Sequence, residues 1–598
     1  MASKTQNQVS VRVELLRQWM RGNHIEAFIV PSTDPHASEY VPSHWETRQW
    51  LSGFTGSAGT AVVTLDNAAL WTDSRYFLAA EEQLEGTPFQ LMRERMEGTP
   101  DIAQWLVAVL HKGDTVGIDG WVNSVVAAES WRTTLERNGI SLDVLKNPFD
   151  TIWASRPLLP ENAVEIQPFG FAGETIASKA ARIRPLLDEK GANAMLVSAL
   201  DEIAWLTNLR GSDVHCNPVF VAYCLLLPQE IRLYINKEKL TKSVKDYLSQ
   251  ENITVRPYTE IENDLQALEK ATILLTPETN VRLAAAVAQN NTIVNAPSPI
   301  ATLKAVKNEA ETEGFRRAML RDGVALVKFL RWLKPAVKAG GVTEMDVDRK
   351  LTSLRAAQPL FRDISFDTIA GYADHGAIVH YEATEATDRE LHPEGLLLID
   401  SGAQYQDGTT DITRTIALGE PTEKERHIYT LVLKGHIALA RLKFPSGASG
   451  TQLDLSARYA MWQEGYNFGH GTGHGVGSYL NVHEGPHQIR MNYMPAPIVA
   501  GMTVTDEPGL YLPGCFGVRT ENMLLAVPFK ETEFGKFLQF ETLTLCPIDT
   551  VPIDREMLTL PEKQWLNDYH QTVRNKLMPL LDDEADRQWL YEATLPIQ

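Results

Sequence analysis

An eight-residue stretch that occurs twice places the strongest constraint on how this chain can fold. Residues 50–57 read WLSGFTGS and residues 205–212 read WLTNLRGS. Each stretch follows a short apolar run, residues 27–30 and residues 194–197, which itself comes after a helix-like segment. Apolar runs that alternate with amphipathic segments are typical of α/β folds. The sequence therefore predicts two related α/β units, with chance similarity over eight residues as the alternative.

Two proline-containing joins and a change of pattern divide the 598-residue chain further. Residues 157–168 separate the two α/β copies, and residues 295–299 precede a third block. This block opens with long helical patterns at residues 308–333 and 342–357, followed by strand-like segments and glycine-rich turns. A chain this long exceeds one core, because domains hold roughly 150 residues. We predict an α/β protein with domains at residues 1–160, 161–303 and 304–598.

Composition restricts the partners of the protein. Its formal charge is −20, whereas binding to a phosphate backbone relies on clustered Lys and Arg; the simpler interpretation is an acidic surface that keeps the protein soluble. The apolar run at residues 219–227 is far shorter than the roughly 20 residues that span a bilayer. The first residues lack the apolar stretch of a signal peptide, and the four cysteines contain no CxxC pair. We expect a cytoplasmic protein without nucleic-acid or membrane partners.

Two aspartates flank a predicted hairpin in the third block. The apolar run LLLI leads directly into Asp400, and the alternating segment that starts at Asp411 follows the turn at residues 406–408. Such a hairpin can bring the two carboxylates side by side, where they repel unless a proton or a cation lies between them. Taken alone, the pair can also be read as solvated turn acids.

A second cluster is the stretch GHGTGHGVG at residues 469–477, which carries His470 and His474. Glycine at every second position lets other groups approach the backbone closely. A flexible linker is the alternative, but Tyr479 and Leu480 immediately after the stretch indicate an ordered setting. Two histidines in a segment with so few other side chains are hard to explain by core packing.

Two further acidic motifs follow, VTDEPG with Glu507 and GVRTEN with Glu521. In an extended segment the period of two places Arg519 and Glu521 on one face. Each acid taken alone is more typical of an exposed surface residue. Together, four carboxylates and a neutral imidazole balance the charge of two divalent cations, and we predict the following donors: Asp400, Asp411, His474, Glu507 and Glu521.

The chemistry of these donors indicates the type of ion and of reaction. Oxygen-dominated ligation suits hard or borderline ions, so we expect Mn²⁺, with Zn²⁺ or Co²⁺ as substitutes. Two-metal sites serve aminopeptidases by holding and deprotonating a water.

The string HEGPH at residues 483–487 also satisfies the HExxH pattern of zinc proteases. That pattern requires a helix, which Gly485 and Pro486 oppose, so we reject it.

Five motifs in order resemble a known family. GAIVHY at residues 376–381, LLLIDSGAQYQDGTTDITRT, GHGTGHGVGSYLNVHEGP, VTDEPG and VRTEN are similar to the pita-bread metallopeptidases, and more narrowly to the cytosolic three-domain aminopeptidase P, or Xaa-Pro aminopeptidase, family. WTDSRYF, LDEIAWLTNLRGSDV and SPIATLKAVKN extend the resemblance through the chain. It implies a C-terminal α+β pita-bread catalytic domain, hydrolysis of the bond between an N-terminal residue and proline at a dinuclear metal centre, and a homodimer.

The resemblance also implies roles for individual residues. One metal would be held by Asp411, His474, Glu507 and Glu521, and the other by Asp400, Asp411 and Glu521. Glu507 would also act as general base, and the residues that line the site are His380, His470 and His483, with Tyr511 and Arg519 in support. A prolidase, which cleaves only Xaa-Pro dipeptides, and a non-catalytic binding protein of the same fold remain the alternatives.

Overall fold

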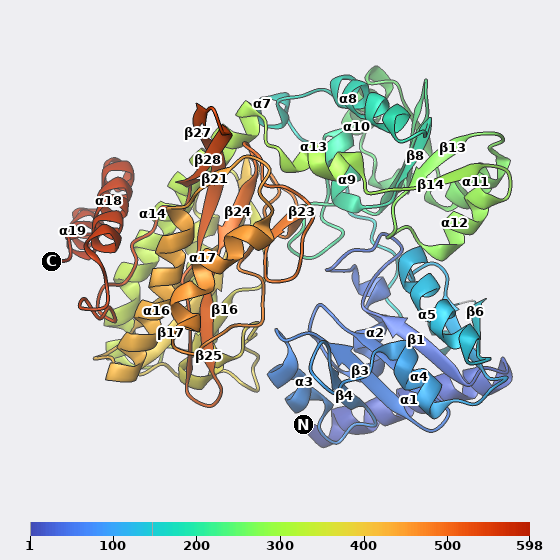
Figure 1. The fold of residues 1–598 in the computed structure, drawn as a ribbon, viewed down its shortest axis with the longest axis horizontal. Coiled ribbons are helices and arrows are strands. Elements are labelled where there is room, and N and C mark those ends of the chain that lie inside the picture. Colours follow the sequence, from blue (N-terminus) through green and yellow to red (C-terminus); the bar gives the residue numbers. More distant parts are fainter. Residues whose placement is uncertain (1, 146) are drawn as a thin grey trace. The chain divides into compact units, whose positions relative to one another are not determined.

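A computed structural model describes residues 2–145 and 147–598 (Figure 1). These residues form two compact units, the first from residues up to 166, 174–215 and 219–300, and the second from residues 167–173, 216–218 and 301–598. Among the residues described, none of the helices combines the length and the apolar character that crossing a bilayer requires.

The first unit contains a six-stranded sheet with the order β4-β3-β2-β1-β5-β6. Its central strand pairs antiparallel with β2 and parallel with β5. The central strand and its neighbours are largely buried, and apolar residues make up most of these strands. The strands are β1 (Ala27–Pro31), β2 (Thr60–Thr64), β3 (Ala68–Thr72), β4 (Gln90–Arg93), β5 (Thr115–Asp119) and β6 (Ser141–Leu145).

A second six-stranded sheet in the same unit repeats this topology. Its order is β12-β11-β10-β8-β13-β14, and its central strand again pairs antiparallel with one neighbour and parallel with the other. The strands are β8 (Ala194–Val197), β10 (Ala222–Leu226), β11 (Ile231–Ile235), β12 (Ile253–Arg256), β13 (Thr272–Leu275) and β14 (Thr292–Asn295). The prediction of two related α/β domains is confirmed, whereas their limits at residues 160 and 303 remain predictions.

The repeated eight-residue stretch marks the same helix end in both copies. Helix α2 (Thr47–Ser52) is closed by Gly53 with φ +79°, and α9 (Leu200–Thr207) is closed by Asn208 with φ +50°. Both values lie in the left-handed region, where glycine and asparagine are the favoured helix C-caps. The likeness therefore reflects a shared backbone conformation as well as shared core residues.

The two copies also contact each other reciprocally. The amide of Val125 at the start of α5 (Val125–Arg137) donates to the carbonyl of Thr279 at 2.9 Å, and the amide of Val281 at the start of α12 (Val281–Ala288) donates to the carbonyl of Asn123 at 3.0 Å. The helix N-caps Ser124 and Asn280 form an isolated bridge between these bonds. Equivalent positions of the two repeats thus face each other, as in a two-fold symmetric interface.

The second unit begins with the two predicted helices, α14 (Glu309–Ala339) and α15 (Glu344–Ala356). A capping box of Asn308 and Glu311 fixes the first turn of α14. The helix runs beyond the predicted end at residue 333 because apolar positions recur as far as Val337, which is buried. A proline at position 335 is accommodated within this helix.

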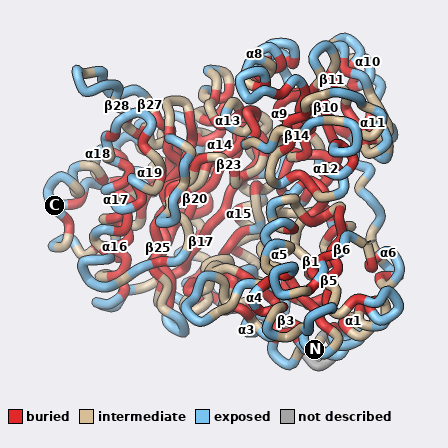
Figure 2. Tube along the Cα trace, turned by 45° about the vertical axis from the view of Figure 1, so that its right-hand side comes forward, coloured by how far each residue is buried: buried red, intermediate tan, exposed pale blue. Residues whose placement is uncertain are grey.

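Strands of the second unit carry the motifs with acids and histidines. Every residue of β17 (Leu396–Ser401) and β20 (Ile412–Ala417) is buried, and Figure 2 colours both strands accordingly. Helix α16 (Glu423–Ala440) contributes Ile428 and Val432 to a core that also contains Val518 and Met523 from the strands. One three-stranded sheet of this unit has the order β16 (Ile369–Tyr372), β17 (Leu396–Ser401) and β20 (Ile412–Ala417), and its four-stranded sheet has the order β21 (Lys443–Pro445), β28 (Gly535–Thr542), β27 (Asn522–Thr532) and β24 (Thr503–Asp506).

Candidate metal centre

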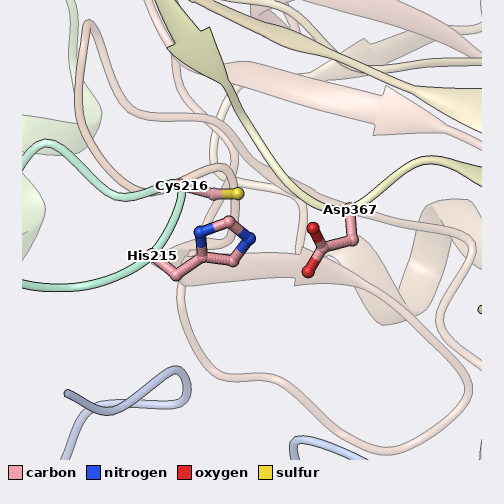
Figure 3. Close-up of side chains that lie close together, drawn as sticks. All are labelled: His215, Cys216 and Asp367. Atoms are coloured by element: carbon pink, nitrogen blue, oxygen red, sulfur yellow. The ribbon is translucent and has the colours of Figure 1, made fainter. Parts of the chain in front are cut away.

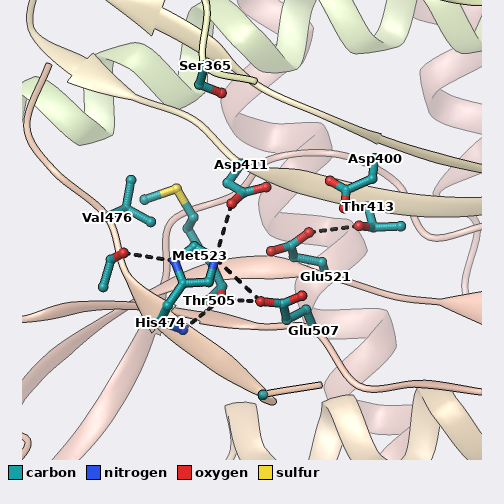
Figure 4. Close-up of polar contacts among 12 residues, drawn as sticks. Ser365, Asp400, Asp411, Thr413, His474, Val476, Thr505, Glu507, Glu521 and Met523 are labelled. Atoms are coloured by element: carbon teal, nitrogen blue, oxygen red, sulfur yellow. Dashed lines mark hydrogen bonds and ion pairs between the residues drawn. The ribbon is translucent and has the colours of Figure 1, made fainter. Parts of the chain in front are cut away.

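The predicted hairpin brings Asp400 and Asp411 to one place. Strands β17 and β20 pair antiparallel with Asp400 opposite Thr413, and β18 (Ala403–Tyr405) and β19 (Gly408–Thr409) continue the hairpin to its turn. Gly402 is required between these segments, because a Cβ there would lie 2.0 Å from the carbonyl oxygen of Thr410. Figure 4 shows the two aspartates directed toward a shared space.

The glycine-rich stretch is ordered and carries His474 on β22 (Gly473–Gly475). A Cβ at Gly473 would lie 1.9 Å from the carbonyl oxygen of Thr505, so β22 can approach β24 this closely only with glycine. The Nδ1 of His474 lies 2.8 Å from the carbonyl oxygen of Gly475 and therefore carries the proton. Its Nε2 consequently presents a lone pair 3.4 Å from Glu507 Oε1 and 3.5 Å from Asp411 Oδ2.

Arg519 and Glu521 point to one side of the chain, as the period of two predicts. Arg519 ends β26 (Phe516–Arg519), and Glu521 immediately precedes β27. The hydroxyl of Thr413 donates to Glu521 Oε2 at 2.8 Å and accepts from Arg519 Nε at 3.0 Å. Arg519 also donates to Asp400 Oδ2 at 2.6 Å. One donor atom each from Asp411, His474 and Glu521 lies within 4.8 Å of the others.

The electrostatics of this cluster favour cations. Burial, followed by the charges of Asp400 and Glu507, raises the pKa of Asp411 well above its usual value. Burial, followed by the charges of Asp411 and Asp400, does the same to the pKa of Glu521. Burial is also the main cause that raises the pKa of Glu507 to about 7. Within the described structure the buried Asp400 Oδ1 has no hydrogen-bond partner. Four carboxylates and one imidazole nitrogen therefore fit two hard or borderline divalent cations.

Hydrogen bonds link the predicted His470 to one of these donors. The Nδ1 of His470 lies 2.7 Å from the carbonyl oxygen of Gly471, so its Nε2 accepts from the Tyr511 hydroxyl at 2.7 Å. Tyr511 belongs to β25 (Gly509–Leu512), and its hydroxyl accepts from Arg519 at 2.7 Å. A continuous chain of hydrogen bonds thus joins His470 to Asp400 through Tyr511 and Arg519.

The other two histidines approach from different segments. The ring centroid of His483 lies 4.5 Å from that of His474, with the rings nearly perpendicular. His380 follows Val379, whose carbonyl oxygen accepts from Arg519 NH1 at 3.4 Å. Arg519 therefore contacts the segment that carries His380 as well as Asp400.

As predicted, the HEGPH string is not helical, and its residues from Glu484 onward open β23 (Glu484–Ile489). The buried carboxylate of Glu484 accepts from Lys304 at 2.6 Å and also pairs with Lys307. The buried His487 places its Nε2 2.7 Å from the carbonyl oxygen of Thr503. Both groups serve the structure of the strand rather than a zincin-type helix.

Sequence reasoning missed the hydroxyls that orient the acids. Thr413 lies two residues after Asp411, and Thr505 lies two residues before Glu507 and donates to its Oε1 at 3.0 Å. The signal was present, because a period of two in a strand directs these side chains to the same face as the acids.

Cys216 and Asp367, drawn in Figure 3, form another grouping of metal-binding residue types within the second unit. Burial, followed by the negative charge of Asp367, raises the pKa of the Cys216 thiol. The thiolate is the form that binds metals. A thiol that holds its proton at neutral pH is a poor ligand, so this grouping gives no candidate site.

Comparison with family models assigns the parts of the chain. Residues 12–151 and 155–311 match models of the creatinase/prolidase N-terminal domain. Residues 313–528 match metallopeptidase family M24, and residues 536–597 match the C-terminal region of that family. The duplicated sheets thus lie within the two N-terminal matches, and the carboxylate cluster lies within the M24 match.

Relatives extend over nearly the whole chain. A probable Xaa-Pro aminopeptidase P of Aspergillus fumigatus is 41% identical over 98% of this chain and 92% of its own length. Aminopeptidase P1 of Lotus japonicus is 39% identical over 96% of this chain and 97% of its own. The crystal structure of X-prolyl aminopeptidase from Caenorhabditis elegans, described as a cytosolic enzyme with a dinuclear active site, superposes with a TM-score of 0.92 at 36% identity, covering 96% of this chain and 95% of that one. The chain therefore belongs to the Xaa-Pro aminopeptidase P group of the pita-bread metallopeptidases, family M24.

Proposed function

We propose that this protein is an Xaa-Pro aminopeptidase, which hydrolyses the peptide bond between an N-terminal residue and a following proline. The observation that carries the proposal is the complete donor set in a chain 41% identical, over 98% of its length, to a probable Xaa-Pro aminopeptidase P. A non-catalytic relative has no need to keep four converging carboxylates, which repel one another without cations.

The donors divide between two divalent ions. One would be held by Asp411, His474, Glu507 and Glu521, and the other by Asp400, Asp411 and Glu521. We propose Mn²⁺ as the ion, with Zn²⁺ or Co²⁺ as substitutes, because oxygen donors predominate. When bound, such a pair of ions polarises the scissile carbonyl and makes a water molecule more acidic.

Glu507 would move the proton. Thr505 holds one of its oxygens at 3.0 Å, and the pKa of Glu507 is raised by burial to about 7 in the protein alone. A carboxylate at this position takes a proton from the attacking water and returns it to the nitrogen of the leaving peptide.

The histidines and their supports handle the substrate. His483, whose ring centroid lies 4.5 Å from that of His474, and His380 would stabilise the oxyanion that forms at the carbonyl. His470 would orient the peptide, with its proton on Nδ1 and its Nε2 bonded to Tyr511. Since the proline nitrogen lacks a proton, recognition of the ring depends on shape and apolar contact.

Arg519 bears on the choice between this activity and that of a prolidase. A prolidase must capture the free carboxylate of a C-terminal proline with positive charge. Arg519 is engaged by Asp400, Tyr511 and Thr413 and is nearly fully buried. Arg519 therefore supports the metal donors and is not available to bind the carboxylate of a C-terminal proline. Residues that follow proline in a longer peptide are not excluded by it.

A comparison of substrate lengths tests the proposed function. With one residue held constant before proline, we expect tri- and pentapeptides to have kcat/KM about tenfold or more above that of the Xaa-Pro dipeptide, a difference of roughly 1.4 kcal/mol. The measurement is steady-state hydrolysis with Mn²⁺ present. A preference for the dipeptide would show a prolidase, and cleavage of none of the three peptides would refute both assignments.

We also propose that the protein is a cytoplasmic homodimer. The exposed side of α17 (Gly450–Trp462) carries Leu455, Tyr459 and Trp462 at helical spacing, with exposed fractions of 49%, 59% and 39%, and Tyr493 is 77% exposed. Large apolar side chains grouped on one helix face favour a self-complementary contact.

A charged residue on this face should separate the subunits. We expect Tyr459→Asp to shift the protein from dimer to monomer in light scattering, because a carboxylate cannot be desolvated cheaply in an apolar contact. Phe534→Asp, at an 82% exposed position on the β27–β28 turn, is the control and should leave the mass unchanged. A monomeric wild type, or a dimer that tolerates Tyr459→Asp, would contradict this surface.

A further inference from the structure

Helix α17 carries a buried ion pair beneath the loop that leads to the metal centre. Asp454 and Arg458 are one turn apart, and Arg458 Nε donates to Asp454 Oδ2 at 2.7 Å. Their exposed fractions are only 2% and 1%. Burying two charges costs several kcal/mol per ion before their attraction is counted, so a buried pair is weak evidence for stability.

The guanidinium of Arg458 binds the backbone of that loop at two points. It donates to the carbonyl oxygen of Phe468 at 2.6 Å and to the carbonyl oxygen of His470 at 2.9 Å. A third bond, of 3.0 Å, goes to the side-chain oxygen of Asn467, and the ring of Phe468 lies 3.6 Å from the guanidinium carbon. The rigid fork of an arginine can satisfy several acceptors in this way, whereas a lysine cannot.

The carboxylate of Asp454 holds the other end of the loop. Its Oδ1 accepts from the hydroxyl of Thr472 at 2.5 Å. The carbonyl oxygen of Thr472 in turn accepts from the amide of Glu507 at 2.8 Å. One ion pair therefore contacts the loop on both sides of His470.

The loop needs such support because of its composition. Its residues 467–472 lie outside helices and strands, and glycine stands at 469 and 471. Glycine leaves the backbone with more freedom than any other residue, and fixing it costs more conformational entropy. The ring of His470 is bonded to Tyr511 on one side, but this bond alone leaves the backbone of the loop unconstrained.

We propose that Arg458, supported by Asp454, is a positioning residue that fixes the loop so that the ring of His470 meets the substrate in the productive orientation. This inference rests on the proposed role of His470 in the peptidase reaction. The hydrogen bonds of Arg458 go to Asp454 and to residues of the loop, so its effect on His470 passes through the backbone of residues 468–470.

A double-mutant cycle tests this role. Loss of a group that orients a metal ligand typically lowers metal affinity or activity by about 10–100-fold. We expect a loss of kcat in the same range for Arg458→Met, although Arg458 orients His470 instead of a metal ligand, with KM and metal content little changed. In a His470→Ala background the same substitution should lower kcat by less than about threefold, because its target is gone. In a His483→Ala background it should keep its full effect.

Two further variants keep the test decisive. Arg458→Lys retains the charge beside Asp454 but can reach fewer acceptors. We expect this variant to fold, and it replaces Arg458→Met in the cycle if that protein does not fold. Its loss of kcat should likewise depend on the presence of His470. Arg331→Met is the control for the loss of an arginine–carboxylate ion pair elsewhere in the protein. It removes the pairs with Asp583 and Asp586 and should leave kcat unchanged.

The outcomes separate this inference from the proposed function. Equal losses of kcat in the wild-type and His470→Ala backgrounds, or loss of metal from Arg458→Met, would refute the positioning role while leaving the peptidase assignment in place. A wild-type protein that cleaves no Xaa-Pro peptide would refute both.

Discussion

Removal of divalent metal should abolish peptidase activity, and Mn²⁺ should be among the ions that restore it. The reason is the charge of the site, in which burial and mutual repulsion raise the pKa of Asp411, Glu521 and Glu507 in the protein alone. A pair of ions stabilises transition-state charge by several kcal/mol, so we expect the rate to fall by about 10³-fold or more.

The same reasoning ranks substitutions among the donors. Asp411 is assigned to both ions, so Asp411→Ala should lose more activity and more metal than Asp400→Ala. Elemental analysis of the purified variants, together with kcat/KM on one tripeptide after chelation and after addition of Mn²⁺, provides the measurement. Full activity in protein that is demonstrably free of metal would overturn the two-metal assignment.

Substitution of the histidines should separate chemistry from metal binding. His470→Ala and His483→Ala should each lower kcat by about 10²–10⁴-fold, the range found when a group that acts on the substrate is lost, with metal content nearly intact. His474→Ala should instead reduce metal occupancy, because its Nε2 lies 3.4 Å from Glu507 and 3.5 Å from Asp411.

The control for this series is His427→Ala. That side chain is paired with Glu464 at the exposed end of α16, so its loss should change neither metal content nor rate. Metal analysis beside single-turnover kinetics distinguishes the two classes of variant. Equal metal loss in the three active-site variants would show that the roles of the histidines are divided wrongly.

The fold could be predicted where the backbone conformation restricts which residue types can occupy a position. The likeness between residues 50–57 and 205–212 predicted the duplicated domains because both stretches close a helix with a left-handed residue, Gly53 or Asn208. The alternating segment at Asp411 predicted the hairpin in the same way, since strand periodicity follows from backbone geometry.

The supports of the site were less predictable because their partners are either backbone groups or side chains that are distant in the sequence. Thr413 could have been found by its spacing from Asp411, but Arg458 could not, since its acceptors are backbone carbonyls that follow the end of its own helix. Likewise, Lys304 and Lys307 pair with Glu484 across separations of 180 and 177 positions in the sequence. No local pattern indicates such a contact.

The reciprocal bonds between the two N-terminal repeats have a consequence for how this half of the protein can evolve. In a homodimer, a substitution at a two-fold interface alters both partners at once, so that the same change appears on both sides of the contact and its energetic effect is felt twice. Here each repeat is encoded separately, and Ser124 of one caps its helix opposite Asn280 of the other. The contact keeps its symmetric backbone while each side can acquire a different side chain, which is a freedom that two copies of one chain do not have.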